Sequence, residues 1–357
     1  MKKLNVAIIG QGRSGKNIHG AYFVSDRNDR YTVKYVVDKD PYRRDKAEKM
    51  YPGCKAFESY TELFGLKDID LVVNASYSQM HYPITKDLLA HGFNVLVEKP
   101  FARNQYECAD LIKTAKENKV VLAVFQQTFF APYYDDVLNI MASGKLGKIE
   151  QIDVRFNGFA RRWDWQTAQR NVAGGLYNTG PHPVGLAVGF LGWDKDTKVA
   201  FSKLSSTRLT KGDSDDYAKV ILTAPGKPVV DIEVSSIDAY STYNVKVQGD
   251  RGTFKCTPTK YEYKYIIEEE NPERKFIAES LENENREPAY CGEKLIFHEE
   301  SGTYAGTAFD LGTKGMYEDV YYAITEGRPL KYSPEMITLI YSVIETAHAQ
   351  NPLPVEI

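Results

Sequence analysis

A lysine placed directly after a buried strand is the residue in this sequence best suited to chemistry. Residues 94–97 form a short, mainly apolar run, and Glu98, Lys99 and Pro100 follow it immediately. Proline has no backbone N–H to donate, so Pro100 should end the hydrogen-bond ladder of this strand. Lys99 is then expected at the carboxyl edge of the sheet, where ligands bind in open α/β folds.

A glycine-rich turn lies upstream, between a continuous apolar run at Leu4–Ile9 and a helix-like stretch. Its first glycine would permit a tight turn, its second would let the backbone approach a pyrophosphate, and its third would let the helix pack close to the strand. The phosphate would then lie at the positive N-terminus of the helix. We therefore expect a dinucleotide cofactor here. The expected contacts in the turn are Gly10, Gly12, Arg13, Ser14 and Gly15.

An acidic residue ends the second predicted strand, Tyr31–Val37. The carboxylate of Asp38 could accept hydrogen bonds from both ribose hydroxyls of the cofactor and would repel a 2′-phosphate. Asp38 therefore favours NAD over NADP. The nearby cations Lys39, Arg43 and Arg44 leave NADP open, because they could accommodate the extra phosphate.

The ends of two further strands should complete the cofactor site. Ser76 follows the predicted strand at residues 71–75, and His81 lies a few residues beyond it. His81 could line the nicotinamide side or be purely structural, and Glu98 could orient its loop or pair with a base. The further cofactor contacts that we expect are Ser76, His81, Glu98 and Lys99.

Composition excludes several classes of function. The 357 residues carry 45 basic and 48 acidic side chains, a formal net charge of −3, which gives no electrostatic argument for nucleic acid or an anionic membrane. The four cysteines are far apart, so we expect neither a zinc site nor a disulfide framework. No stretch is long and apolar enough for a membrane span, and the N-terminal run reads as a strand and not as a signal peptide. A cytoplasmic protein with reduced cysteines is the expectation.

The order of predicted elements indicates two domains. Residues 1–124 alternate strand-like and helix-like segments, which predicts a doubly wound parallel sheet. Residues 125–357 contain several strand-like runs followed by helices at 314–326 and 334–350, which predicts an α+β domain with a large, mainly antiparallel, open sheet. The acidic stretch Glu268–Glu300 is expected to be a solvated excursion.

With these motifs in place, the chain resembles the glucose–fructose oxidoreductase / inositol dehydrogenase / rhizopine catabolism (Gfo/Idh/MocA) family over nearly its whole length. The resemblance rests on the turn at 10–15, on the motif at 98–100, and on a third motif at 174–182, which has a glycine pair followed by Asn178 and His182. It implies an N-terminal Rossmann domain, a C-terminal α/β domain, and NAD(P)-dependent chemistry on sugar-like alcohols. It also implies a homodimer or homotetramer formed through the C-terminal sheet.

Several positions depart from the family pattern. Asn178 stands where many members have Asp, and Gly185 stands where an acid is common. Tyr77 follows Ser76 where the family usually has Thr-Pro. Because these positions surround the expected pocket, they leave the substrate more open than the reaction type.

Hydride transfer needs a group that takes or supplies the proton of the reacting hydroxyl. A partly desolvated Lys99 beside the cofactor could have a lowered pKa and act as this general acid/base. His182 could relay the proton or hold a second hydroxyl, and Asn178 could orient either. His182 could instead be a hydrogen-bonded core histidine. Asn178 could be a turn residue or cap in the loop before a helix beginning near Gly180.

The segment at 159–166 combines aromatic, Arg and Asp side chains, which suits a sugar with apolar faces and a polar rim. A charged substrate group could instead meet Arg161 or Arg162, and an ordinary ordered loop between domains or subunits explains the composition equally well. The substrate contacts that we expect are Arg161, Trp163, Trp165 and Tyr177.

Two other functions have precedent in the family that the chain resembles. One is a glycoside hydrolase that uses NAD transiently, and the other is a non-catalytic NAD-binding regulator. Lys99 and His182 argue against the regulator, and nothing in the sequence selects the hydrolase.

Overall fold

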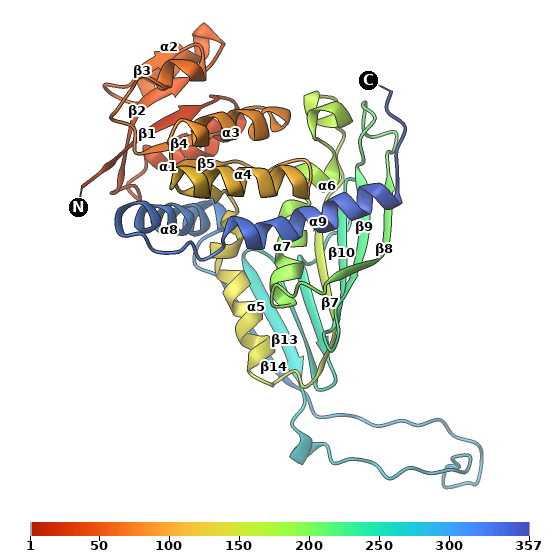
Figure 1. The fold of residues 1–357 in the computed structure, drawn as a ribbon. Helices are drawn as coiled ribbons and strands as arrows, with labels where there is room; N and C mark the ends of the chain where they lie inside the picture. The colour runs from red at the N-terminus through yellow and green to blue at the C-terminus, as the bar shows by residue number, and fades with distance from the viewer. Residues whose placement is uncertain (1, 357) are drawn as a thin grey trace.

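The computed structural model describes residues 2–356, and its N-terminal part is built on a six-stranded parallel sheet (Figure 1). In spatial order its strands are β3 (Lys55–Phe57), β2 (Tyr31–Val37), β1 (Leu4–Ile9), β4 (Leu71–Asn74), β5 (Val95–Val97) and β6 (Leu122–Val124). The order reverses between β1 and β4, and ligands of doubly wound sheets bind at the carboxyl ends of the strands by this switch point. The predicted Rossmann-type sheet is confirmed.

Helices from both ends of the chain cover the two faces of this sheet. One face, which includes Ile9, packs against α3 (His81–Ala90) and α4 (Gln105–Asn118). The other face, which includes Ile8, packs against α8 (Thr313–Glu326). Helix α8 therefore belongs to the core of the first sheet although it lies within the predicted second domain. The boundary between residues 124 and 125 stays a prediction.

The remaining helical segments of this region are short or lie at its edge. They are η1 (Gly15–Gly20), α1 (Ala21–Phe23), α2 (Pro41–Met50), η2 (Tyr60–Leu63) and η3 (Ser78–Met80).

The C-terminal part is built on an eight-stranded sheet that is antiparallel except where β7 and β10 pair in parallel. In spatial order its strands are β14 (His298–Thr303), β13 (Lys260–Tyr265), β12 (Gly252–Cys256), β11 (Val245–Gly249), β7 (Ile149–Asn157), β10 (Val229–Ser235), β9 (Tyr217–Thr223) and β8 (Lys198–Ser205). The predicted large, mainly antiparallel sheet is confirmed.

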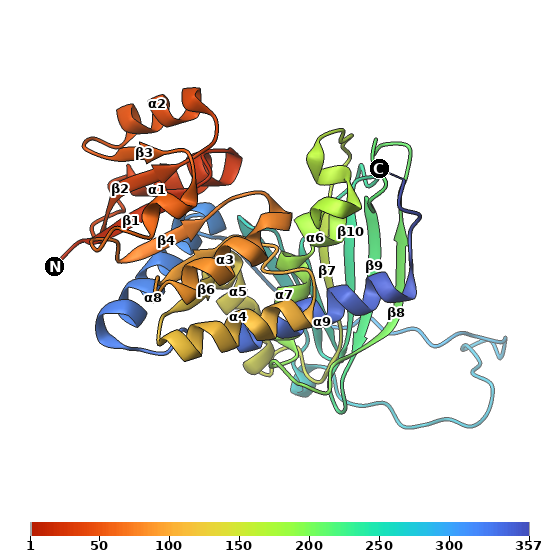
Figure 2. The ribbon, with the colours of Figure 1, turned by 45° about the horizontal axis from the view of Figure 1, so that its top comes forward.

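Helices lie against one face of this second sheet, as Figures 1 and 2 show. They are α5 (Pro132–Ala142), α6 (Gly175–Asn178), α7 (Pro181–Phe190) and α9 (Pro334–Gln350). Burial alternates along the strands because successive side chains point to opposite faces. The opposite face carries ion pairs such as Lys219–Asp231 at 2.7 Å and Lys246–Asp153 at 3.2 Å. Pairing of this face with another copy stays a prediction.

The acidic stretch Glu268–Glu300 is only partly the excursion that we expected. Residues 272–280 and 282–297 are exposed, and this segment extends away from both sheets (Figures 1 and 2). Its last residues, however, belong to β14, which pairs with β13. Its acidic side chains are paired with cations: Glu299 with Lys264 and Glu300 with Lys145, at 2.6 and 2.7 Å.

The helix after the glycine pair begins near the expected position. Helix α7 starts at Pro181 with Gly180 as its N-cap, as the two prolines predicted. The expectation that Asn178 lies in a preceding loop is wrong, because it is the last residue of the short helix α6. Within residues 2–356, no helix has the length and apolar character that a membrane crossing requires.

Helix α9 is tied to the strand end that carries Lys99, which yields a stability prediction. The buried backbone N–H of Phe101 donates to the Tyr341 hydroxyl at 2.5 Å. Tyr341→Phe should remove this acceptor and lower the free energy of unfolding by about 1–3 kcal/mol, because a buried donor is left without a partner. Urea unfolding measures the change. Tyr106→Phe, at a side chain that is 76% exposed, is the control. Equal stability of the two variants would contradict this account.

Candidate active site

Lys99 lies between the two domains, directly beyond β5. Its side chain is partly buried, and Nζ donates to the backbone carbonyl oxygen of Asn178 at 2.7 Å. Burial lowers the pKa of Lys99; the carboxylate of Glu98 opposes this shift, and the charges of Arg13 and Arg162 add to it. A lysine in these surroundings can hold or release a proton nearer neutral pH than an exposed lysine can.

Glu98 is a buried carboxylate whose two oxygens both have partners. Oε2 accepts the backbone N–H of Lys99 at 3.0 Å, and Oε1 lies 3.1 Å from Nε2 of His19. Burial alone would raise the pKa of Glu98, but the hydrogen bond with His19 and the nearby positive charge lower it to about 2. Glu98 is therefore ionised at neutral pH and lies beneath Lys99.

The glycine turn packs tightly at two positions and is open at the third. Gly10 has φ +88°, and a Cβ there would lie 2.4 Å from the carbonyl oxygen of Ala75, at the end of β4. A Cβ at Gly15 would lie 1.8 Å from the carbonyl oxygen of Gly10. At Gly12 the nearest atom would be Nη1 of Arg43 at 4.0 Å. The turn is thus pressed against the sheet and free at Gly12, which fits the close approach of a pyrophosphate.

Asp38 connects the second strand to this turn. Its Oδ2 accepts the backbone N–H of Gln11 at 2.7 Å, and its Oδ1 accepts that of Asp40 at 2.9 Å. Arg43 Nη1 lies 3.7 Å from Oδ2. Each carboxylate oxygen keeps a lone pair for a ribose hydroxyl, while Arg43 stands where an additional phosphate could meet it. The carboxylate of Asp38 therefore favours NAD, and the guanidinium of Arg43 favours NADP.

Ser76 lies just beyond β4 and His81 begins α3, and both side chains form hydrogen bonds within the chain itself. The Ser76 hydroxyl donates to Oδ1 of Asn74 at 2.7 Å. The nitrogens of His81 lie 2.7 Å and 3.1 Å from the carbonyl oxygens of Pro100 and Ser76. Burial lowers the pKa of His81, although these carbonyl contacts oppose the shift. His81 thus joins the β4 loop to the Lys99–Pro100 turn, and its contact with a cofactor stays a prediction.

His182 is brought to Lys99 by α7. Its Nδ1 lies 3.3 Å from the Thr128 hydroxyl, and its ring stacks on Phe156 with centroids 6.3 Å apart. Burial, and after it the charge of Lys99, lower the pKa of His182 to about 3. His182 is neutral under physiological conditions, so it can exchange hydrogen bonds without carrying charge.

Asn178 meets Lys99 through its backbone and not through its side chain. The side chain is paired with Gln166: Nδ2 donates to the backbone carbonyl at 2.9 Å, and Oδ1 accepts from Nε2 at 3.3 Å. Asn178 therefore holds the lysine with a carbonyl that any residue would provide. Gln166 was not among the expected site residues, and its signal was only its place in the polar segment before the glycine pair.

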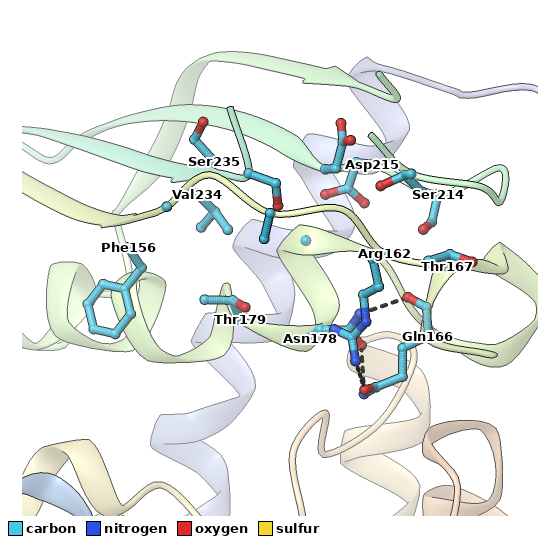
Figure 3. A pocket seen from close by; sticks show the side chains of 17 residues that line it. Phe156, Arg162, Gln166, Thr167, Asn178, Thr179, Ser214, Asp215, Val234 and Ser235 are labelled. Carbon is cyan, nitrogen blue, oxygen red and sulfur yellow. Dashed lines mark hydrogen bonds between the residues drawn. The ribbon is translucent and has the colours of Figure 1, made fainter. Parts of the chain in front are cut away.

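The segment at 159–166 places one of its arginines at the site. Arg162 donates to Asp164 at 2.9 Å and contacts Gln166. It borders a cavity of about 220 Å³ between α6 and the second sheet, together with Phe156, Asn178 and Ser214 (Figure 3). Polar and apolar groups both line this cavity.

The four expected substrate contacts are dispersed. Arg161 is exposed, and Trp163 is 75% exposed. Trp165 meets Tyr77 edge-on, with centroids 4.8 Å apart. Tyr177 turns away from this cavity, because its hydroxyl donates to the carbonyl of Arg103 at 2.8 Å and its ring stacks on His348. Roles in substrate binding for these four residues stay predictions.

Two buried residues behind Lys99, His19 and Tyr317, were also not expected. His19 lies four residues after Gly15, and its position one turn beyond the glycine motif could have drawn attention to it. Tyr317 lies in α8, and no sequence signal connects it to the site. Among residues 2–356, no group of three or more His, Cys, Asp or Glu side chains is arranged to hold a metal ion.

Two family models match the chain. One, described as an oxidoreductase family with an NAD-binding Rossmann fold, matches residues 4–126, and the other, described as a GFO/IDH/MocA C-terminal domain, matches residues 134–255. Together they cover more than half of the chain.

Curated relatives are similar at low identity. The uncharacterized oxidoreductase YdgJ of Escherichia coli (strain K12) is 24% identical over 253 residues, 70% of each chain. The scyllo-inositol 2-dehydrogenase (NADP(+)) IolW of Bacillus subtilis (strain 168) is 24% identical over 194 residues, which are 54% of this chain and 53% of that one. The trans-1,2-dihydrobenzene-1,2-diol dehydrogenase of Mus musculus is 26% identical over 201 residues, which are 55% of this chain and 58% of that one.

Solved structures share the fold over nearly the whole chain. KijD10, a 3-ketoreductase from Actinomadura kijaniata in complex with NADP and TDP-benzene, matches with a TM-score of 0.79 at 16% identity, covering 98% of both chains. The probable oxidoreductase yhhX matches with a TM-score of 0.76 at 19% identity, also covering 98% of both chains. The glycine turn, the lysine beyond β5, the open second sheet and the two matching models agree: the chain belongs to the Gfo/Idh/MocA family of NAD(P)-dependent oxidoreductases.

Proposed function

We propose that this protein oxidises or reduces a hydroxyl-bearing carbon of a sugar, inositol or glycoside, with Lys99 as general acid/base and His182 assisting. The observation that carries the proposal is the placement of Lys99. It is a partly buried amine with a lowered pKa, held by the carbonyl of Asn178 and influenced by the charges of Arg13, from the nucleotide turn, and of Arg162, from the C-terminal part. The names of relatives, among them an inositol dehydrogenase and a diol dehydrogenase, support a polyol-like substrate.

The glycine turn and Asp38 would hold the cofactor, as their geometry fits a pyrophosphate and a ribose. When bound, NAD(P) accepts or supplies the hydride of the reaction. In oxidation the neutral amine of Lys99 takes the hydroxyl proton of the substrate at Nζ, and in reduction its ammonium returns a proton to the carbonyl oxygen. The carbonyl of Asn178 holds Nζ toward the second domain.

His182 would bind the substrate without changing its own protonation state. Because its pKa is about 3, its ring is neutral and can orient a hydroxyl beside Lys99. The cavity beside Arg162 and Gln166 would accommodate the rest of a carbohydrate or polyol. We further propose a cytoplasmic homodimer or homotetramer that pairs through the open sheet and acts in carbohydrate metabolism.

Replacement of Lys99 tests the chemical role. Lys99→Met should lower kcat by about 10²–10⁴-fold, the usual contribution of a general acid/base, while NADH affinity changes little. Turnover against a panel of inositols, aldoses and glycosides, followed by nicotinamide absorbance, and NADH titration by fluorescence measure the two effects. Lys113→Met, at a 72% exposed lysine of α4, is the control.

Normal turnover in Lys99→Met would contradict this mechanism. Release of an aglycone without net NADH would indicate the hydrolase, and NADH binding without turnover on any substrate would favour the regulator.

The pH dependence separates Lys99 from His182. The rate of oxidation should rise with pH as Lys99 loses its proton, with a midpoint below the ordinary lysine value because burial lowers its pKa. Since His182 is already neutral above about pH 3, His182→Asn should lower the rate but leave the midpoint within roughly 0.3 pH unit. Profiles of kcat/KM against pH measure both. Disappearance of the rising limb in His182→Asn would instead assign the titrating group to the histidine.

The preference for NAD or NADP tests the roles that we propose for Asp38 and Arg43. We expect the native enzyme to prefer NAD, because the carboxylate of Asp38 repels a 2′-phosphate. Asp38→Ser should raise kcat/KM for NADP relative to NAD by about tenfold, an energy of roughly 1.4 kcal/mol. Arg43→Ala should have the opposite effect on NADP. Native preference for NADP, as in the name of the Bacillus subtilis relative, would show that Arg43 outweighs Asp38.

A further inference from the structure

A chain of buried side chains runs behind Lys99 and connects three separate elements. The hydroxyl of Tyr317, from α8, lies 2.7 Å from Nδ1 of His19, which belongs to η1. Nε2 of His19 lies 3.1 Å from Oε1 of Glu98, and Oε2 of Glu98 accepts the backbone N–H of Lys99 at 3.0 Å. His19 and Tyr317 are 0% exposed, and Glu98 is 3% exposed.

The donors and acceptors of this chain can be assigned in one direction. The ionised Glu98 can only accept, so Nε2 of His19 must donate to it. In a neutral ring, Nδ1 then accepts the proton of the Tyr317 hydroxyl. The backbone carbonyl of Tyr317 accepts in turn from the Tyr31 hydroxyl at 2.7 Å, which ties α8 to the sheet. Every polar group along this path has a partner.

Aromatic packing prevents His19 from turning away. Its ring meets Phe125 with centroids 4.5 Å apart and Tyr317 with centroids 6.0 Å apart, both edge-on. Tyr22 stacks on the other side of Tyr317 at 4.6 Å. Because the interior is close-packed, His19 keeps one orientation toward Glu98.

Among residues 2–356, Glu98 is the carboxylate whose charge acts on Lys99. Tyr317 and Tyr341, from α8 and α9, face Glu98 and are uncharged, since burial raises the pKa of both. Seven titratable or charged groups, from the elements packed around this pair, face Lys99 or Glu98. They are Arg13, His19, His81, Arg162, His182, Tyr317 and Tyr341. Both arginines disfavour the ammonium form of Lys99, and the charge of Glu98 opposes them.

We propose that His19, supported by Tyr317, is a positioning residue: it holds Glu98 as a fixed carboxylate beneath Lys99 and so sets the pH range in which Lys99 exchanges its proton. The inference rests on the proposed function of Lys99 for its catalytic consequence. The coupling itself is a property of the folded protein and is measurable without a substrate.

Removal of His19 should act on Lys99 through Glu98. Without the hydrogen bond from His19, burial raises the pKa of Glu98, so that the carboxyl gains a proton or loses its fixed position. Lys99 then faces two arginines without a carboxylate, and its pKa falls further. Loss of an interacting opposite charge shifts a pKa by about 1–3 units, which is at least tenfold in the protonation equilibrium.

Competitive labelling measures the protonation of Lys99 directly. Trace acetic anhydride acetylates only the neutral amine, and mass spectrometry of the Lys99 peptide across pH yields its titration midpoint in the full-length protein. We expect His19→Leu to lower this midpoint by about one unit or more. His19→Gln, which keeps one donor and one acceptor, should restore it. Tyr317→Phe should lower it by a smaller amount.

Two further variants serve as the positive and negative controls of this measurement. Glu98→Gln removes the charge and should reproduce the full shift. Tyr22→Phe removes a buried hydroxyl that has no hydrogen-bond partner within residues 2–356, from the ring stacked on Tyr317, and should leave the midpoint unchanged. This variant controls for disturbance of the aromatic cluster.

The proposal is overturned if Glu98→Gln shifts the midpoint while folded His19→Leu and Tyr317→Phe keep the native value. Should His19→Leu fail to fold, Tyr317→Phe decides alone: a native midpoint in that variant overturns the proposal. A shift in labelling combined with full turnover in Lys99→Met would leave the coupling intact and refute the proposed function instead. The two ideas therefore fail separately.

Discussion

An ionised carboxylate buried at the end of β5 constrains the region around the candidate active site. Removing a charge from water is costly unless it is paired and hydrogen-bonded, so Glu98 requires partners on both of its oxygens. One partner is the backbone N–H of Lys99, which sets the strand end, and the other is His19, which brings in the helical segment after the glycine turn. Tyr317 completes the set from a helix near the C-terminus. The nucleotide turn, the lysine and α8 are thus positioned by one electrostatic requirement.

The candidate site lies where the N-terminal and C-terminal parts meet, and two hydrogen bonds across that junction use a backbone group. Lys99 donates to the carbonyl of Asn178, and Phe101 donates to the hydroxyl of Tyr341. Backbone acceptors have positions fixed by helices and not by rotamers, so they define where the amine points. Arg162 and Gln166 line the cavity beside this junction, while Phe159 and Trp163 of the same segment are exposed.

The electrostatic environment affects the protonation of Lys99 and His182 differently. Burial lowers the pKa values of both Lys99 and His182, but the consequences differ. For the lysine, the shift moves its titration toward the working pH of an enzyme. For the histidine, it removes the charged form and leaves a neutral hydrogen-bonding ring. Amide and hydroxyl groups at Gln166 and Thr128 meet this site without adding charge.

Local sequence patterns determined much of this protein. Apolar runs separated by helical periods predicted the parallel sheet, because strands buried on both faces must be continuously apolar. The glycine spacing and the proline after Lys99 placed the turn and the lysine at one sheet edge, since each is a local backbone constraint. The two prolines near His182 likewise predicted the start of α7. The sequence did not predict β14, because its acidic residues suggested a solvated segment. In the structure, lysines distant in the chain pair with Glu299 and Glu300.

Tertiary structure decided the rest, and the reason is sequence distance. His19 and Tyr317 are 298 positions apart, so no local pattern could reveal that they share a hydrogen bond. The side chain of Tyr177 turns toward α9, and Asn178 presents its carbonyl to Lys99, because packing of α6 against its neighbours sets both orientations. The sequence alone determined which residue types can bind a nucleotide and move a proton. Only the packing of distant elements decided which of those side chains meet, which are neutral and which face away.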